Sequence, residues 1–316
     1  MIKALSFLVS TGFCWVAVGA VVGLIGRKGF NILYYQVMSG VFGLCAGLAI
    51  YVFSPASVIP PAGLPTSTWA GVVAGGLANG LFNYLMIQFM GVAMTRGPNA
   101  IVWATIQSGL IYPFLMGWLV FGVPMNAFRA VGIVLIIASI VLYAARGGAG
   151  NGAVEGGGKI PLRIWFVPSL LGMLCCGINQ CGGNLPSYLE HGQDFPSVFR
   201  TLLSNAGSLA GCLGHVLLRG ACGKWPPKPR KGELASLAVY TLGLMCVGYT
   251  STVFLQFPGL DLLKNLGAGA MGYPIMVASC IIGFFPYGLF VLREKINPIQ
   301  ALGAVVGVAG IILGCL

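Results

Sequence analysis

Ten long apolar runs constrain this chain more than any other feature. A helix needs about 20 mostly apolar residues to cross the hydrocarbon core of a bilayer. Backbone polar groups in lipid must bond within a helix or a closed barrel, and the short alternating segments of barrel strands do not occur in this sequence. We therefore predict an all-α membrane protein with ten transmembrane helices. The expected spans are 4–26, 33–53, 69–90, 98–121, 126–145, 164–183, 196–218, 235–256, 267–291 and 297–315.

The composition agrees with a lipid environment. Of the 316 residues, 57% are hydrophobic and only 7% are charged. A water-soluble domain typically carries about 25% charged residues. The first run follows Lys3 without a small-residue cleavage site, so we expect a retained helix and not a removed signal peptide. We expect an integral protein of a bacterial inner (plasma) membrane, with the lipid bilayer as a partner.

The distribution of positive charge predicts the orientation. Of the 17 Lys and Arg residues, only Lys3, Arg129, Arg200 and Lys264 fall on the side of the expected termini. Loops rich in positive charge remain in the cytoplasm. We therefore predict that both termini are extracytoplasmic. The net charge of +11 is interpreted as a topology signal and not as a nucleic-acid site.

The chain divides into two similar halves. A glycine-rich stretch at 146–163 is expected to be a linker between residues 1–145 and 164–316. Five helices in each half would invert the second copy in the membrane, so we predict two inverted five-helix repeats. Residues 171 positions apart match at Phe114 and Phe285, Asn126 and Asn297, Ala130 and Ala301, Gly132 and Gly303, Val134 and Val305, and Ala138 and Ala309.

Glycine spacing predicts where helices pack closely. The chain has 49 glycines, and small residues four apart let helix backbones approach each other in lipid. The predicted packing seams are Gly19 with Gly23, Gly43 with Gly47, Gly71 with Gly75, Gly207 with Gly211, Gly303 with Gly307, and Gly310 with Gly314.

Two motifs resemble known carriers. Residues 292–303 read LREKINPIQALG, with a Leu-x-Glu turn followed by Gln-x-x-Gly. This stretch resembles the final hairpin of the drug/metabolite transporter superfamily, whose ten-helix plan matches the whole chain. Residues 80–94, GLFNYLMIQFMGVAM, resemble the L-rhamnose and glucose/ribose uptake branch of that superfamily. The resemblance implies a central cavity near the midplane, lined by both halves and opened alternately to either side.

Polar side chains inside the expected spans are candidates for the cavity lining. Polar groups are costly in lipid and usually face the bundle interior or water. An aromatic face beside amide groups suits a hydroxyl-rich ligand. The alternative is that the same amides are interhelical hydrogen bonds without a ligand. The candidate substrate-binding residues are Thr11, Trp15, Asn79, Asn83, Asn99, Trp103, Gln107, Asn179, Gln180, Tyr249, Gln256 and Tyr273.

Lys264 and Asn265 complete the candidate site. Both lie just before the expected span 267–291, and a cation at a helix N-terminus costs about 0.3–1 kcal/mol. This cost suggests a role in holding an anionic or hydroxyl-rich group at the cavity mouth. The alternative is a simple ion pair between Lys264 and Asp261.

The sequence lacks the residue patterns of a proton-coupled pump, an enzyme, a nucleotide-binding protein and a metal site. All six carboxylates are expected in loops or at helix ends, so we predict that transport is not driven through a membrane carboxylate. Glu294 is expected to pair with a neighbouring cation at a turn. No group of nucleophile, base and orienting residue indicates an enzyme, and no nucleotide-binding motif occurs. The ten cysteines contain no Cys-x-x-Cys pair and are interpreted as packing residues, so no metal and no cofactor are expected.

These patterns together favour transport of a small molecule. We expect a secondary carrier that moves a small polar solute by alternating access, with a sugar or a related metabolite favoured. The alternatives are an exporter of an amino acid or a drug-like compound, or a membrane scaffold that transports nothing. Either a monomer or a homodimer is compatible with the sequence.

Overall fold

The protein is built from helices joined by short turns. The computed structural model describes residues 1–144, 161–266, 269–294 and 296–315, and no strand occurs among them. Most of the expected linker and Lys295 lie outside the described residues. The main helices are α1 (Ile2–Arg27), α2 (Ile32–Phe53), α3 (Thr66–Met94), α4 (Asn99–Gln107), α5 (Ile111–Leu119), α6 (Ala127–Ala144), α7 (Leu162–Asn184), α8 (Ser197–Ala221), α9 (Glu233–Ser251), α10 (Phe257–Asn265), α11 (Gly272–Pro286) and α12 (Pro298–Cys315).

Short helical turns connect some of these helices into longer rods. A 3₁₀ turn at Ser108–Leu110 joins α4 to α5, and a π turn at Thr252–Gln256 joins α9 to α10. A second π turn, Tyr287–Val291, extends α11. The remaining 3₁₀ turns are Pro55–Ser57, Leu185–Ser187, Gly192–Asp194 and Gly269–Met271.

Eight of the described helical rods are long and apolar enough to cross a membrane. The other two expected spans correspond to the shorter apolar helices Ala127–Tyr143 and Pro298–Gly314. The sequence-based expectation of an all-α membrane fold therefore agrees with the structure. The eight rods are Ile2–Arg27, Ile32–Phe53, Thr66–Met94, Asn99–Leu119, Leu162–Ser187, Ser197–Ala221, Glu233–Asn265 and Gly272–Val291.

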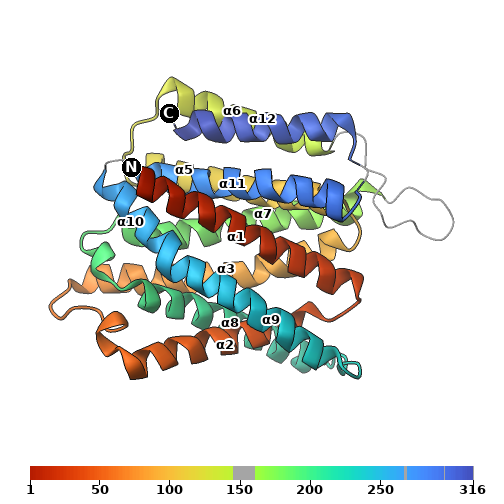
Figure 1. Cartoon of the computed structure of the whole chain (residues 1–316), viewed down its shortest axis with the longest axis horizontal. Coiled ribbons are helices and arrows are strands. Elements are labelled where there is room, and N and C mark those ends of the chain that lie inside the picture. Colours follow the sequence, from red (N-terminus) through yellow and green to blue (C-terminus); the bar gives the residue numbers. More distant parts are fainter. Residues whose placement is uncertain (145–160, 267–268, 295, 316) are drawn as a thin grey trace.

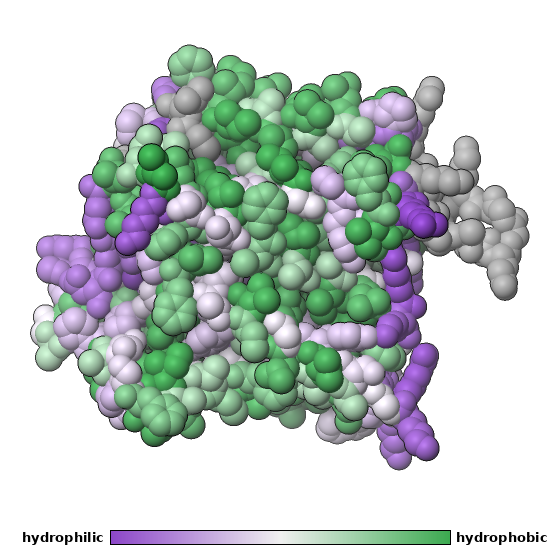
Figure 2. All heavy atoms as spheres, viewed as in Figure 1, coloured by the Kyte–Doolittle hydropathy of each residue, from purple (hydrophilic) through white to green (hydrophobic). Residues whose placement is uncertain are grey.

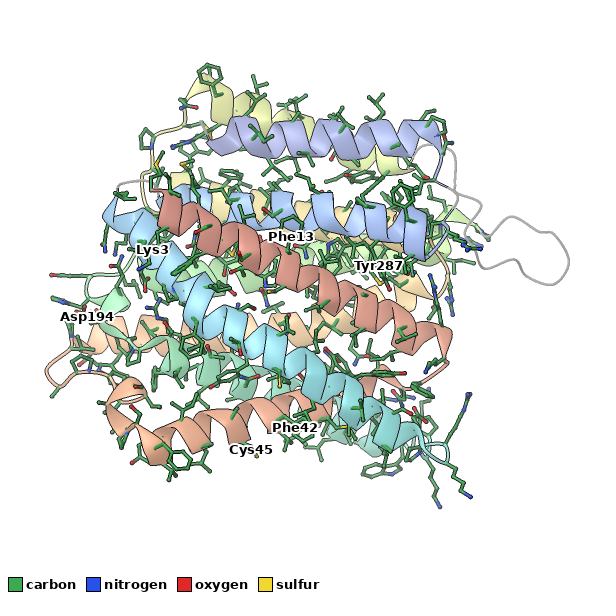
Figure 3. All side chains as sticks on the ribbon, viewed as in Figure 1. Lys3, Phe13, Phe42, Cys45, Asp194 and Tyr287 are labelled. Atoms are coloured by element: carbon green, nitrogen blue, oxygen red, sulfur yellow. The ribbon has the colours of Figure 1, made fainter. Side chains whose placement is uncertain are left out.

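The surface has the layout of a membrane protein. Figure 1 shows the helices crossing the molecule from side to side, with both termini at the same end. Figure 2 shows hydrophobic side chains across the middle and hydrophilic side chains at the two ends. Phe13 and Cys45 lie exposed on α1 and α2, whereas Asp194 lies at one polar end (Figure 3). The exposed apolar band is the surface that lipid would cover.

Glycines bring helix backbones into contact, as their spacing predicted. A β-carbon at Gly80 of α3 would overlap the backbone carbonyl of Ser204 in α8. One at Gly207 of α8 would overlap the carbonyl of Leu77 in α3. This reciprocal contact holds α3 against α8 with no side chain between them. The predicted seam at Gly207 is therefore confirmed as a packing position.

Helices α6 and α12 form a separate layer on the rest of the molecule (Figure 1). A β-carbon at Gly132 would lie 2.6 Å from the carbonyl oxygen of Gly310, so only glycine allows this approach. Gly314 extends the seam toward the ring of Phe114. Glycine spacing on α12 thus sets the distance between the two helices of this layer.

The turns that lead into α6 and α12 have the same backbone conformation. Gly122 and Arg293 both adopt positive φ, of 65° and 53°. The backbone N–H of Val123 donates to the Gly117 carbonyl at 2.9 Å, and that of Glu294 donates to the Gly288 carbonyl at 3.0 Å. Each of these positions in the first turn lies 171 residues before its counterpart in the second.

Candidate functional site

A polar cavity of about 210 Å³ lies between helices from both parts of the chain. Trp15 of α1, Asn83 of α3 and Tyr249 of α9 lie near the middle of their helical rods, so the cavity sits well inside the apolar band. Its wall consists of Trp15, Val18, Tyr35, Ser39, Asn79, Asn83, Ile87, Asn179, Thr201, Ser204, Asn205, Leu244, Met245, Gly248, Tyr249, Thr252, Gln256, Phe257 and Tyr273.

One side of the cavity is organised by a reciprocal pair of amides. The side-chain nitrogen of Asn79 donates to the backbone carbonyl of Asn179 at 2.8 Å, and that of Asn179 donates to the carbonyl of Asn79 at 2.9 Å. The Ser204 hydroxyl donates to Oδ1 of Asn79. These bonds connect α3, α7 and α8 at a single level of the bundle. They also satisfy most of the polar groups of Asn79 within the protein.

Aromatic rings form another side. The rings of Trp15 and Tyr273 lie 6.3 Å apart at an angle of 42°. Nε2 of Gln256 donates to the Tyr273 hydroxyl at 3.3 Å, which orients that ring. The Tyr249 hydroxyl is buried and has no hydrogen-bond partner among the described residues. A flat aromatic surface therefore stands beside a free phenol group.

Several polar groups of the wall are available to a ligand. Asn83 and Thr252 line the cavity, and within the described chain neither side chain forms a hydrogen bond. The free Tyr249 hydroxyl belongs to the same set. Buried polar groups are normally paired, so these groups are the ones expected to meet water or a bound solute.

Among the residues that the structure describes, none with a charged side chain lines the cavity. A buried ion pair lies directly behind it instead, where Arg200 precedes the wall residue Thr201. Nη2 of Arg200 lies 2.7 Å from Oδ2 of Asp261, and the Arg200 side chain is only 4% exposed. Its guanidinium also lies 4.9 Å from the ring centroid of Phe257, another wall residue. This pair connects α8 to α10 without contributing charge to the wall.

Seven of the fourteen predicted site residues lie in the cavity wall, and seven do not. Whether those in the wall bind a solute stays a prediction. Thr11 is buried on α1, where its hydroxyl donates to the Phe7 carbonyl at 2.9 Å. The residues in the wall are Trp15, Asn79, Asn83, Asn179, Tyr249, Gln256 and Tyr273. Those outside it are Thr11, Asn99, Trp103, Gln107, Gln180, Lys264 and Asn265.

The predicted stripe on α4 lies in the packed core. Trp103 stacks on Phe284 with ring centroids 5.1 Å apart, and its Nε1 donates to Cys280 Sγ at 3.2 Å. Oε1 of Gln107 accepts from Cys176 Sγ, 3.9 Å away, and Nε2 of Gln180 donates to the same sulfur at 3.2 Å. All nine residues of α4 are buried. A helix enclosed on every side buries its polar groups against other helices, whatever face they occupy.

The prediction for Lys264 was wrong about its position in the helix. Lys264 lies in the last turn of α10, and Asn265 ends that helix. A cation near a helix C-terminus is favoured by the helix dipole, so the cost that suggested a binding role does not exist. Asp261 pairs with Arg200 and not with Lys264. Asp261 also lies inside the rod Glu233–Asn265, which corrects the expectation that every carboxylate is in a loop or at a helix end.

Glu294 is the N-terminal cap of α4, which the sequence did not predict. Its carboxylate oxygens accept from the backbone N–H groups of Asn99 at 2.8 Å and Ala100 at 3.0 Å. The cation that contacts it is Arg27 of α1, 4.0 Å away, and not a neighbour in the turn as expected. Burial raises the pKa of Glu294 above its ordinary value, although the two N–H groups and Arg27 oppose this shift.

The sequence analysis named none of the five polar or aromatic wall residues on α2 and α8. They are Tyr35 and Ser39 on α2, and Thr201, Ser204 and Asn205 on α8. The last three, with Ser208, recur at the spacing of one helical face, which is the signal used on the other helices. They were overlooked because no candidate was taken from the expected spans 33–53 and 196–218, although Tyr35 is aromatic and Asn205 is an amide.

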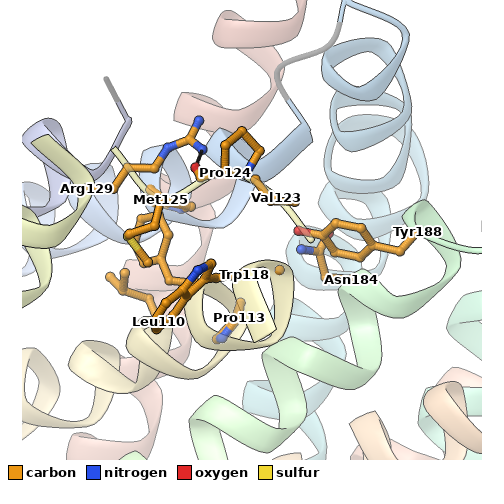
Figure 4. A pocket seen from close by; sticks show the side chains of 12 residues that line it. Leu110, Pro113, Trp118, Val123, Pro124, Met125, Arg129, Asn184 and Tyr188 are labelled. Atoms are coloured by element: carbon orange, nitrogen blue, oxygen red, sulfur yellow. Dashed lines mark hydrogen bonds between the residues drawn. The ribbon is translucent and has the colours of Figure 1, made fainter. Parts of the chain in front are cut away.

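A smaller pocket lies at the end of the molecule that holds the termini. Its volume is about 20 Å³, enough for a single water. Figure 4 shows Asn184 and Tyr188 side by side on one wall, and Arg129 across from them donating to the Pro124 carbonyl at 2.7 Å. A solute-sized ligand does not fit there, so the larger polar cavity is the candidate site.

Comparisons with known proteins identify a fold and no family. No protein-family model matches the sequence, and no curated protein matches it. Sixteen chains of solved structures match. One of them, described only as "Crystal structure of protein", is 17% identical, covers 99% of this chain and 96% of its own, and gives a TM-score of 0.59. The protein therefore shares an overall fold with that structure.

Proposed function

We propose that the protein is a secondary carrier for a small, neutral, hydroxyl-rich solute such as a sugar. The observation that carries this proposal is the polar, uncharged cavity in the middle of an apolar helical bundle. Polar residues at this depth are costly unless they face water or a substrate. A membrane scaffold without a ligand would have no use for the unpaired groups of Asn83 and Tyr249.

The chemistry of the wall favours a neutral solute over an amino acid. An amino acid carries two charges, and a desolvated charge needs an opposite charge or several hydrogen bonds. The wall offers amides, hydroxyls and aromatic rings, and its described residues include no Asp, Glu, Lys, Arg or His. Trp15 and Tyr273 would pack against the apolar face of a sugar ring, while Asn83 and Tyr249 would bond its hydroxyls. The cavity is also smaller than the 300–1,000 Å³ typical of sites for drug-sized molecules.

The architecture proposed for this carrier is two inverted five-helix repeats, which makes α6 and α12 the fifth and tenth spans. Helix contacts support it, because each contact between the repeats has a counterpart when the two repeats are interchanged. The packing of α1 on α11 corresponds to that of α7 on α4 and α5. The packing of α3 on α7 corresponds in the same way to that of α9 and α10 on α1. The matching turns before α6 and α12 give further support. Alternating access then follows from rocking of one repeat against the other around the cavity.

The proposed orientation places both termini outside the cytoplasm. The end of the molecule opposite the termini holds Arg27, Lys28 and Arg96 in the described chain, together with the basic turn between α8 and α9. Loops with this excess of positive charge are retained in the cytoplasm.

Counterflow in proteoliposomes tests the proposal. Vesicles loaded with one unlabelled monosaccharide at a time should accumulate the labelled sugar if it is a substrate, and vesicles loaded with neutral amino acids provide the competing class. We expect sugar counterflow and no amino-acid counterflow. Accumulation of amino acids alone, or of neither class across the panel, would reject the proposed substrate class.

Two variants connect transport to the cavity. Asn83→Leu should weaken sugar affinity roughly tenfold, because an unpaired polar group costs about 1–3 kcal/mol. Its melting temperature should stay close to that of the wild type, since Asn83 makes no hydrogen bond within the described chain. Asn265→Leu is the matched control, as this amide is exposed and outside the wall. Equal affinity in the two variants would exclude the cavity as the binding site.

A further inference from the structure

A groove on the basic end of the molecule has the chemistry of a phospholipid site. It has a volume of about 240 Å³ and lies between the end of α1, the start of α2 and the end of α3. Ile25, Ile32 and Val92 form its apolar wall, and Val92 is 44% exposed on the band that faces lipid. The groove therefore opens toward the bilayer and not only toward water.

Positive charge gathers at the rim of this groove. Arg96 lines it directly, and within the described chain its guanidinium forms no ion pair or hydrogen bond. Arg230, from the turn between α8 and α9, places its guanidinium 3.5 Å from where a β-carbon of Gly29 would lie, next to the groove residue Phe30. Lys28 lies 5.8 Å from the centre of the Phe30 ring. Arg96 thus lines the groove, and Lys28 and Arg230 lie next to it. Among the described residues, the nearby carboxylate of Glu233 is already occupied by the backbone N–H groups of Asn31 and Arg230.

We propose that this groove binds the headgroup of an anionic phospholipid. The phosphate would lie between Arg96 and Arg230, where paired guanidinium groups recognise phosphate oxygens well. The first carbons of the acyl chains would lie on Ile32 and Val92, since Ile25 behind them is fully buried. A soluble phosphate would gain nothing from this apolar wall, so the combination of charge and open apolar surface selects a lipid. Juxtamembrane basic clusters attract anionic lipids in the same way.

Occupancy would add a further contact between three helices that already approach one another at this end. A β-carbon on Gly26 of α1 would lie 3.0 Å from the Thr95 side chain of α3, and one on Gly91 of α3 would lie 2.8 Å from the Ile32 side chain of α2. A bound headgroup would hold Arg96 at the end of α3 close to the turn that carries Arg230. The lipid is therefore expected to stabilise the protein, independently of which solute is transported.

Lipid titration of the purified full-length protein in mild detergent tests the proposal. Dioleoyl phosphatidylglycerol should raise the melting temperature in a saturable manner, and native mass spectrometry should retain one such lipid. Dioleoyl phosphatidylcholine and inorganic phosphate should do neither. Equal protection by phosphatidylcholine would reject recognition of the charge, and equal protection by inorganic phosphate would reject a lipid ligand.

Matched variants locate the site. Arg96→Gln should lower the affinity for phosphatidylglycerol about tenfold. Arg163→Gln removes the same charge from an exposed position at the start of α7, outside the groove, and should leave the affinity unchanged. Val92→Trp fills the groove without changing charge and should also weaken binding. Equal losses in Arg96→Gln and Arg163→Gln, or full affinity in Val92→Trp, would overturn the proposed site.

Discussion

The ion pair between Arg200 and Asp261 should dominate the stability of the region behind the cavity. Replacing Asp261 with Asn keeps the shape but removes the negative charge that faces a nearly buried guanidinium. Arg200 would keep its bond to the Phe195 carbonyl at 2.9 Å, which accepts from Nε. Breaking a buried pair by removing one partner costs about 3–5 kcal/mol. Because Asp261 itself is 21% exposed and the Asn oxygen still accepts one bond, we expect about 2–3 kcal/mol.

Thermal or denaturant unfolding in detergent measures this cost, and three further variants make the result decisive: Asp194→Asn, Arg200→Leu, and the double variant of Arg200→Leu with Asp261→Asn. Asp194→Asn removes an exposed carboxylate that contacts His191 and should change stability by less than about 0.5 kcal/mol. The double variant Arg200→Leu with Asp261→Asn leaves no unpaired buried charge, so it should be more stable than the sum of the two single losses predicts. A loss in Asp261→Asn no larger than in Asp194→Asn, or strict additivity in the double variant, would refute the reasoning.

The cap on α4, the contact between α3 and α8, and the orientation of the termini can also be tested. Glu294→Gln should destabilise the protein by about 1–3 kcal/mol, because an amide N–H group then faces one of the two backbone N–H groups that start α4. The pKa of Glu294 is higher in the folded protein than in the unfolded chain, so its contribution to the free energy of unfolding should be fully present below the unfolded pKa and be lost as pH rises through the folded pKa. Melting temperatures of the wild type should therefore fall over this pH range, whereas those of the Gln variant should not. Gly80→Ala should cost about 1–3 kcal/mol through overlap with Ser204, whereas Gly243→Ala, with open space around it, should be neutral in the same unfolding assay. A reporter enzyme that works only in the periplasm should be active when it is fused after Leu316, and a reporter that works only in the cytoplasm should be inactive there. The opposite result would reverse the proposed orientation.

The helical rods were predictable because the requirement for them is local. Each span must be long and apolar on its own account, so α1, α2, α3 and α8 appear in the sequence nearly as they do in the structure. Glycine seams were predictable for a similar reason, since only small residues permit the contact between Gly207 and the Leu77 carbonyl. The matching turns at 117–130 and 288–301 could also be aligned from sequence, because their conformation depends on a few neighbouring residues.

The cavity wall was only half predictable because it depends on which helices surround each helix. Asn79 and Asn83 on α3 and the stripe of Asn99, Trp103 and Gln107 on α4 look alike in sequence, with polar groups four residues apart. On α3 this face opens into the cavity, whereas α4 is enclosed by its neighbours on every side. What surrounds α4 is decided by residues far along the chain, such as Phe284 and Glu294. A single sequence therefore identifies polar faces but not the surroundings of each face.

Lys264 shows how one local irregularity can reverse an electrostatic argument. The expected span ended at residue 256, and this placed Lys264 just before the next expected span, 267–291. In the structure Pro258 occupies the first turn of α10, where its missing N–H is tolerated, and the π turn at Thr252–Gln256 joins this helix to α9. The rod therefore continues to Asn265, and Lys264 meets the negative end of a dipole instead of the positive end. The same continuation moves Asp261 into a helix opposite Arg200, so the charges near this end of the cavity stabilise the bundle rather than face the solute.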